Sequence, residues 1–244
     1  MNLKAPDRVT FNRSGFCPGC GHGVAGRLIA EVAEEMGLSD KLIMTIDVAC
    51  ASIHLSALKF DMVMTAHGRP LAAAIGLKKV RKENPVLAYM GDGAAYAIGM
   101  AETMHAAIRN DNIIVIVINN AIYGMTGGQM APTTLPGQKT TSSPFGKDAK
   151  RAGAPVRIED IYSGFDIAYL ARGVLVGAAG INKSKKMIRK AFEKHMAGEG
   201  LCYVELLSPC PTNFNLTPLK AKEFVLNDML QYFPLGEFKG GDVK

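Results

Sequence analysis

The sequence predicts an α/β fold built on a parallel β-sheet with helices on both faces. Short apolar runs bounded by turn residues alternate with longer amphipathic stretches, which is the pattern of repeated strand and helix units. The chain has 244 residues, of which 48% are hydrophobic and 20% are charged, a composition typical of globular proteins rather than disordered ones. This length allows one large core or two packed lobes, and we expect a single domain over residues 1–244.

The individual elements follow from the apolar pattern. Strands are predicted at 42–46, 86–90, 113–118 and 202–207, because each run is too short and too continuously apolar for an exposed helix. We place these four strands at the centre of the sheet. Helices that can cross back over the sheet are predicted at 24–36, 71–82, 97–109, 183–196 and 219–232.

One long segment has no clear periodicity. Residues 123–155 are crowded with Gly, Pro and Thr and form either a long ordered loop or a disordered one. Loops of this length are uncommon inside compact domains and are often functional. We therefore expect this segment to cover a site or to contact another subunit.

Hydropathy and charge narrow the class of protein. The chain has neither an apolar window of about 18 residues nor the apolar stretch of a secretory signal in its first twenty residues, so we expect a cytoplasmic protein with no membrane association. The net charge is +6, but the densest basic stretch, 182–195, surrounds Met187, Ile188, Ala191 and Phe192 at helical spacing. This pattern predicts a solvated helix face, or a docking face for an acidic electron carrier, rather than nucleic-acid binding.

Polar residues follow two of the predicted strands. Strand 86–90 runs into a Gly-Asp-Gly turn centred on Asp92, and strand 113–118 leads into an Asn pair that ends at Asn120. In a strand-helix-strand unit the two strands are parallel, so Asp92 and Asn120 should meet at the carboxyl edge of the sheet. Their oxygens suit Mg²⁺, which takes further ligands from phosphate, and Gly93 lets the backbone approach an anion at the start of the next helix. The pattern predicts a magnesium diphosphate site.

The Gly-Asp-Gly turn, the Asn pair and the text NNAIYGMTGGQMAPTTLPGQKTT resemble the thiamine-diphosphate-binding beta subunit of the 2-oxoacid:ferredoxin oxidoreductase family, of the 2-oxoisovalerate or 2-oxoglutarate type. The resemblance implies that Asp92, Asn120 and the backbone carbonyl of Ile122 hold Mg²⁺. Many members carry an acidic residue after the turn, where this chain has Ala94 and Ala95, so inferences about substrate preference from that side chain do not transfer. The cofactor contacts implied by the resemblance are Val48, Ala49, Cys50, Ala51, His67, Gly91, Asp92, Gly93, Ala94, Asn120, Ile122, Gly124 and Met125.

A lone histidine also receives a role through the resemblance. His67 precedes Gly68, Arg69 and Pro70, and Pro70 can open a helix. The corresponding element of the family lines the thiamine pocket, which implies a cofactor or substrate contact for His67. Arg69 is either its neighbour in the site or a residue that holds the loop in place.

Five cysteines in a reducing cytoplasm suggest metal or redox chemistry. Cys17 and Cys20 stand in a Cys-Pro-Gly-Cys loop, and two further ligands for a 4Fe-4S cluster can come from Cys50, Cys202 or Cys210. Cys50 and Cys210 follow predicted strands, whereas Cys202 lies inside one and is expected to be a buried structural thiol. A zinc site using Cys17, Cys20, a second histidine, His22, and another cysteine is the alternative.

The resemblance implies a 4Fe-4S cluster on Cys17, Cys20, Cys50 and Cys210, although Ala49 and Ala51 flank the third ligand where the family usually has Gly and Ser. It also implies oxidative decarboxylation of a 2-oxoacid to an acyl-CoA and CO₂, with electrons passing through the cluster to ferredoxin. No catalytic residue is assigned in this chain, because the activating glutamate is expected on an alpha subunit.

Further partners implied are a gamma subunit, a ferredoxin-like delta subunit and coenzyme A, and both branched-chain oxoacids and 2-oxoglutarate stay open as substrates. The alternatives are a subunit of a non-redox thiamine-dependent lyase or transferase, and a noncatalytic metal-binding or nucleotide-binding regulatory module.

Overall fold

The computed structural model describes residues 5–10 and 15–241. Within these residues seven strands form one sheet in the order β2-β1-β3-β4-β6-β5-β7, and all pairs are parallel except β5 and β7. The predicted α/β class with a parallel sheet is confirmed. The strands are β1 (Ile43–Asp47), β2 (Asp61–Thr65), β3 (Val86–Gly91), β4 (Ile114–Asn119), β5 (Tyr169–Val174), β6 (Cys202–Leu207) and β7 (Gly236–Lys239).

The four predicted strands are β1, β3, β4 and β6, and they lie side by side at the centre of the sheet. Their bounds differ from the predicted ones by at most one residue. Residues of β1, β4 and β6 are buried along their whole length, as expected for strands covered on both faces. The prediction missed β2, β5 and β7, which occupy the two edges of the sheet.

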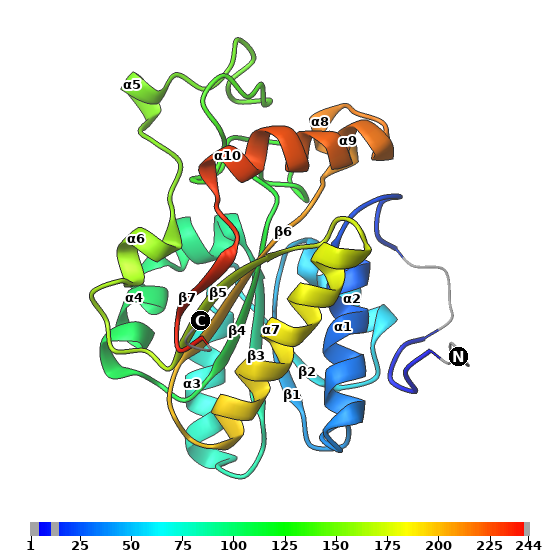
Figure 1. Ribbon diagram of the computed structural model, residues 1–244, viewed down its shortest axis with the longest axis vertical. Helices are drawn as coiled ribbons and strands as arrows, with labels where there is room; N and C mark the ends of the chain where they lie inside the picture. Colours follow the sequence, from blue (N-terminus) through cyan, green and yellow to red (C-terminus); the bar gives the residue numbers. More distant parts are fainter. Residues whose placement is uncertain (1–4, 11–14, 242–244) are drawn as a thin grey trace.

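Helices cover both faces of the sheet (Figure 1). On one face lie α1 (His22–Glu35), the short α2 (His54–Ala57) and α7 (Ala178–Met196), with Ile29 and Phe192 in one core cluster. On the other lie α3 (Pro70–Val80), α4 (Met100–Arg109) and α6 (Ile158–Tyr162), which contribute Leu71, Ala106 and Tyr162 to a second. No helix in the described part of the chain is long and apolar enough to cross a bilayer.

The carboxyl edge of the sheet is covered by late segments of the chain (Figure 1). These are the ordered loop after β4, which contains α5 (Ala149–Ala152), and the helices α8 (Pro211–Phe214), α9 (Pro218–Phe224) and α10 (Leu230–Tyr232). The predicted helix 219–232 is therefore not one regular α-helix, because the π-helical turn η3 (Val225–Met229) separates α9 from α10. Leu135 of the loop and Phe233 share a third core cluster with Ala121, which joins the loop to these helices.

Two short segments shape the edge more closely. The 3₁₀ turn η1 (Cys50–Ile53) follows β1, and the π-helical turn η2 (Ala94–Ile98) follows the Gly-Asp-Gly turn. The helix predicted at 97–109 is therefore α4 preceded by a π turn. The N–H of Gly99 donates to the carbonyl of Ala94 at 2.7 Å, which closes that wider turn.

Candidate cofactor site

A cleft with a volume of about 240 Å³ opens at the carboxyl ends of β1, β3 and β4. Every residue predicted as a cofactor contact lines it, so side chains far apart in the sequence share one cavity. Four further lining residues were not among the predicted contacts. The full lining is His22, Asp47, Val48, Ala49, Cys50, Ala51, His67, Gly91, Asp92, Gly93, Ala94, Asn120, Ile122, Tyr123, Gly124, Met125 and Thr126.

Asp92 stands at the floor of the cleft, one residue beyond β3, and only 2% of its surface is exposed. Its Oδ1 accepts the N–H of Gly93 at 2.9 Å, and its Oδ2 accepts the hydroxyl of Thr133. Burial raises the pKa of Asp92 to about 7, and the hydrogen bonds from Thr133 and Gly93 oppose that rise. A cation beside the carboxylate would reverse the effect of burial.

Asn120 follows the neighbouring strand β4, which pairs in parallel with β3 as predicted. The side chain is 5% exposed, and its Oδ1 has no hydrogen-bond partner. Burying a carbonyl oxygen without a hydrogen-bond partner costs folding free energy, and a bound cation would offset that cost. Asn120 Oδ1 is therefore suited to act as a metal ligand.

Ala121 fixes the turn between the two predicted magnesium ligands, Asn120 and Ile122. Its φ of 57° is in the left-handed region, which is uncommon for a residue other than glycine. The Ala121 N–H donates to Asn119 Oδ1 at 3.1 Å, and its carbonyl accepts from Thr134 Oγ1 at 2.7 Å and Gln138 Nε2 at 3.1 Å. Side chains therefore hold both backbone groups of this residue.

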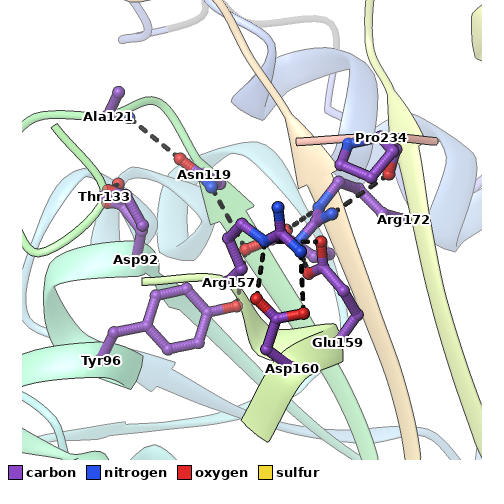
Figure 2. A network of polar contacts seen from close by, with 11 residues as sticks. Asp92, Tyr96, Asn119, Ala121, Thr133, Arg157, Glu159, Asp160, Arg172 and Pro234 are labelled. Carbon is purple, nitrogen blue, oxygen red and sulfur yellow. Dashed lines mark hydrogen bonds and ion pairs between the residues drawn. The ribbon is translucent and has the colours of Figure 1, made fainter. Parts of the chain in front are cut away.

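Figure 2 shows that the Asn119 amide also contacts a buried network of polar and charged side chains on the face of the sheet that α6 covers. Asn119 Nδ2 donates to Glu205 Oε1 at 3.2 Å, and the hydroxyl of Tyr96 donates to the same oxygen at 2.7 Å. Glu205 in turn pairs with Arg172, and the side chains of both residues are fully buried. The turn that carries Asn120 thus rests on charged groups in the core.

His67 faces the cleft from the loop after β2. Its Nδ1 lies 2.8 Å from Asp47 Oδ2, while Asp47 Oδ1 accepts the N–H of Gly68 at 2.8 Å. Asp47 is fully buried at the end of β1 and so fixes the imidazole against the cavity. Arg69 instead pairs with Glu102 and donates to the Ile98 carbonyl at 3.2 Å, which holds the loop against η2.

Tyr123 packs against the Gly-Asp-Gly turn. A Cβ built at Gly93 would collide with the Tyr123 ring, so any larger residue here would have to displace that ring. The Tyr123 hydroxyl donates to the Gly93 carbonyl at 3.4 Å, and its ring lies 6.2 Å from that of His67, measured between centroids. Tyr123, which follows β4, therefore holds the Gly-Asp-Gly turn in place.

Four of the five cysteines influence one another. Burial raises the pKa of Cys20 to about 12, and Cys210, Cys50 and Cys17 all add to the rise. Burial raises the pKa of Cys50 to about 11, with Cys210 and Cys17 adding to it. Cys202 lies apart at the amino end of β6, where burial raises its pKa to about 12 and no other cysteine contributes.

Cys17, Cys20, Cys50 and Cys210 are called the cysteine group below, and one member of this group borders the cleft. Cys50 lines the cavity, and a Cβ built on Gly124 would lie 3.3 Å from Cys50 Sγ. In the described ranges no three His, Cys, Asp or Glu side chains converge closely enough to hold one metal ion. A tetrahedral zinc site needs donors about 2 Å from a single point, whereas a cluster interposes iron and sulfide between its thiolates. His22 Nδ1 lies 2.8 Å from the Tyr89 hydroxyl, which occupies this nitrogen of the alternative zinc ligand.

Sequence reasoning overlooked three residues that shape the site. Asp47 ends β1 in the way that Asp92 follows β3, so the rule that located Asp92 could also have located Asp47. Tyr123 and Thr133 lie in the aperiodic segment, where no pattern indicates which side chain turns inward. Their roles appear only when the loop is folded over the sheet edge.

Comparisons with known proteins identify relatives of this chain. Residues 47–206 match the family model "Thiamine pyrophosphate enzyme, C-terminal TPP binding domain". Ketoisovalerate oxidoreductase subunit VorA of Methanothermobacter marburgensis is 36% identical over 97% of this chain and 52% of its own length. The 2-oxoglutarate synthase subunit KorB of Archaeoglobus fulgidus is 33% identical over 92% of this chain and 84% of its own. The chain spans about half the length of the VorA relatives.

A solved structure, the 2-oxoglutarate:ferredoxin oxidoreductase from Magnetococcus marinus, superposes with a TM-score of 0.77 over 100% of this chain and 87% of its own, at 24% identity. This likeness confirms the fold. The family match and the KorB relative extend it to ancestry, because both cover most of the chain. The chain belongs to the thiamine pyrophosphate enzyme family, among the beta-type subunits of 2-oxoacid:ferredoxin oxidoreductases.

Proposed function

We propose that this chain is the thiamine-diphosphate-binding and iron-sulfur-binding subunit of a multi-subunit 2-oxoacid:ferredoxin oxidoreductase. The complex would convert a 2-oxoacid to an acyl-CoA and CO₂ and pass the electrons to ferredoxin. The observation that carries the proposal is that Asp92, Asn120 and Cys50 all line the same cleft. The proposed metal-ligand oxygens border the same cavity as Cys50, one of four cysteines that affect one another electrostatically.

Asp92, Asn120 and the Ile122 carbonyl are the proposed magnesium ligands. The donor set fits, because Asn120 Oδ1 is buried without a partner and burial raises the pKa of Asp92 to about 7. Mg²⁺ would stabilise the carboxylate and neutralise the diphosphate. The backbone at Gly93, Gly124 and Met125 would surround the phosphate oxygens, with Gly93 kept free of a side chain by the ring of Tyr123.

Thiamine diphosphate, when bound, supplies the carbon nucleophile and the electron sink for decarboxylation. The residues of this chain would position it. Residues 48–51 would pack along it, and His67, fixed by Asp47, would donate or accept a hydrogen bond at the cleft wall. Among the described residues that line the cleft there is no Glu, and Asp47 is engaged by His67 and Gly68, which supports a partner alpha subunit as the source of the activating glutamate.

The proposed cluster ligands are Cys17, Cys20, Cys50 and Cys210. Their mutual electrostatic effects support the assignment, as does the position of Cys202 at the other end of β6. At Cys20, Cys50 and Cys210, iron would replace the thiol protons that burial retains, because a bound cation favours the thiolate. A cluster at this position would border the cofactor cleft and could receive electrons directly from the bound cofactor.

The remaining parts of the proposal follow the sequence and the family resemblance described above. We place the protein in the cytoplasm, as one domain over 1–244, joined by alpha, gamma and ferredoxin-like delta subunits. The relatives' names include ketoisovalerate and 2-oxoglutarate, and the substrate is proposed to be an oxoacid of one of these two types.

The test uses full-length protein purified without oxygen. Visible absorption with iron and sulfide analysis measures the cluster, and calorimetric titration measures Mg²⁺-dependent binding of thiamine diphosphate. Asp92→Ala should abolish cofactor binding and leave the cluster band intact, whereas Asp228→Ala, at an exposed carboxylate on η3, should change neither. Cofactor binding without iron would indicate a non-redox lyase or transferase. Bound zinc without cofactor binding would indicate a regulatory module.

A further inference from the structure

We propose that Asn213 is a positioning residue that links the cysteine group to the glycine-rich loop of the cofactor cleft, setting the reduction potential of the first and the shape of the second. The proposal rests on the proposed function. Asn213 lies in α8, three residues after Cys210, and does not line the cleft. It belongs to none of the sequence motifs described above.

The amide of Asn213 is shared between two acceptors. Its Nδ2 donates to the Gly124 carbonyl at 2.9 Å and to Cys210 Sγ at 3.4 Å. The nitrogen carries two hydrogens, so both bonds can form at once. One side chain therefore connects a proposed cluster ligand to a residue proposed to flank the diphosphate.

The loop is fitted closely around this side chain. A Cβ built on Gly128 would lie 3.0 Å from Asn213 Oδ1, and Gly128 has a φ of +83°, so glycine is favoured there on both counts. A Cβ built on Gly124 would lie 3.3 Å from Cys50 Sγ and 3.7 Å from Asn120 Nδ2. Gly124 is thus next to a second cluster cysteine and a magnesium ligand, and Asn213 holds its carbonyl in place.

The bond to sulfur has an electrostatic consequence. Asn213 Nδ2 donates to Cys210 Sγ at 3.4 Å, and a hydrogen-bond donor at this position stabilises negative charge on the sulfur. Hydrogen bonds to ligating sulfurs are among the factors that set cluster potentials, because reduction adds negative charge to the cluster. Asn213 should therefore make the potential more positive and the cluster a better electron acceptor for the cofactor.

Two variants distinguish loss of the hydrogen bonds from a change in side-chain size. Asn213→Leu has a similar size and no donor, and Asn213→Asp keeps the shape but places an acceptor against the sulfur. Asn227→Leu and Asn227→Asp, at an exposed position on η3, are the matched controls. Each protein is purified without oxygen as the full chain or its complex, and iron and sulfide are quantified first. A wild-type protein without a cluster would refute the proposed function itself.

The potential is then measured by a redox titration followed by electron paramagnetic resonance, and binding of Mg²⁺-thiamine diphosphate by calorimetry. Both Asn213 variants should shift the potential negative, Asp more than Leu, and weaken cofactor binding by about threefold to tenfold, the loss of one hydrogen bond. The controls should match wild type. An unchanged potential in cluster-loaded Asn213→Leu would overturn the proposal. Loss of iron from both folded variants would also overturn it, since Asn213 would then be needed for assembly rather than tuning.

Discussion

Removing one charge from the buried Arg172–Glu205 pair should destabilise the protein far more than the loss of an exposed ion pair would. Neither side chain is exposed to solvent. Burial disfavours the charged guanidinium, but Glu205 and Glu159 outweigh it and raise the pKa of Arg172. The guanidinium also donates to the Pro234 carbonyl at 3.1 Å (Figure 2) and lies 5.3 Å from the ring centroid of Phe233. These contacts hold both charges in the core, where the burial of each charge is compensated by the other.

The structure sets the size of each effect. Arg172→Met leaves the Glu205 carboxylate buried with only neutral donors, Tyr96 and Asn119, and breaking such a pair costs about 3–5 kcal/mol. Glu205→Gln should cost about 3 kcal/mol, at the lower end, because Glu159 still faces Arg172. The double variant buries neither charge, so its cost should be about 2–3 kcal/mol smaller than the sum of the two single costs.

Urea unfolding of the four proteins, followed by far-ultraviolet circular dichroism, measures the free energies and gives the coupling as a double-mutant cycle. The chain should be kept in one state of cofactor loading throughout, because a bound ligand adds to apparent stability. Costs that simply add in the double variant would show that the pair is not energetically coupled. Single-variant costs below about 1 kcal/mol would show that the charges are solvated, and the reasoning from burial would be wrong.

Three further predictions concern the cleft, the cysteines and pH. Gly93→Ala should weaken Mg²⁺-thiamine diphosphate binding about tenfold or more in calorimetry, because its methyl group meets the Tyr123 ring; unchanged affinity would contradict the close packing. Cys210→Ser should reduce the iron content and Cys202→Ser should not, and the reverse result would overturn the ligand choice. Burial lowers the pKa of His195 in the folded protein to about 3, so between about pH 6.5 and pH 3 this histidine is protonated in the unfolded chain and neutral in the folded one. The contribution of neutral His195 to the free energy of unfolding is complete above about pH 6.5 and is lost as the pH falls. Between about pH 7 and pH 5, urea unfolding of the wild-type protein should lose about 2 kcal/mol more than unfolding of His195→Gln, which keeps the contributions of His22 and His54. An equal loss in the two proteins would refute the prediction.

The centre of the sheet was predictable from sequence because its strands are buried on both faces. A short run of continuously apolar residues suits a strand covered by helices on both sides, and β1, β3, β4 and β6 were located to within a residue. The edge strands were missed for physical reasons. In β2, Val63 and Met64 are exposed, so the strand has no buried face to impose a pattern. In β5, Arg172 interrupts the apolar run, and its pairing with Glu205 and Glu159 makes that burial tolerable.

The site was predictable to the extent that strand ends position it. Asp92 and Asn120 follow adjacent strands, so their meeting depended only on the order of the strands. Thr133 contacts Asp92 from a segment 41 residues further along, and Asn213 contacts Cys210 and Gly124 from a four-residue helix. These contacts depend on how loops fold over the edge, and hydropathy carries no information about that.

The position of the cleft follows from the direction in which the chain leaves each strand. After β1 the chain turns to the face covered by α1 and α7, where Ala51 joins their core cluster. After β3 it turns to the opposite face, where Ala94 joins the cluster of α3 and α4. Because β1 and β3 are neighbours, the diverging connections leave a crevice between their ends, which is where open α/β sheets bind ligands. Asp47 and Asp92 border that crevice from its two strands, so the chain places two carboxylates at the point where the backbone connections diverge.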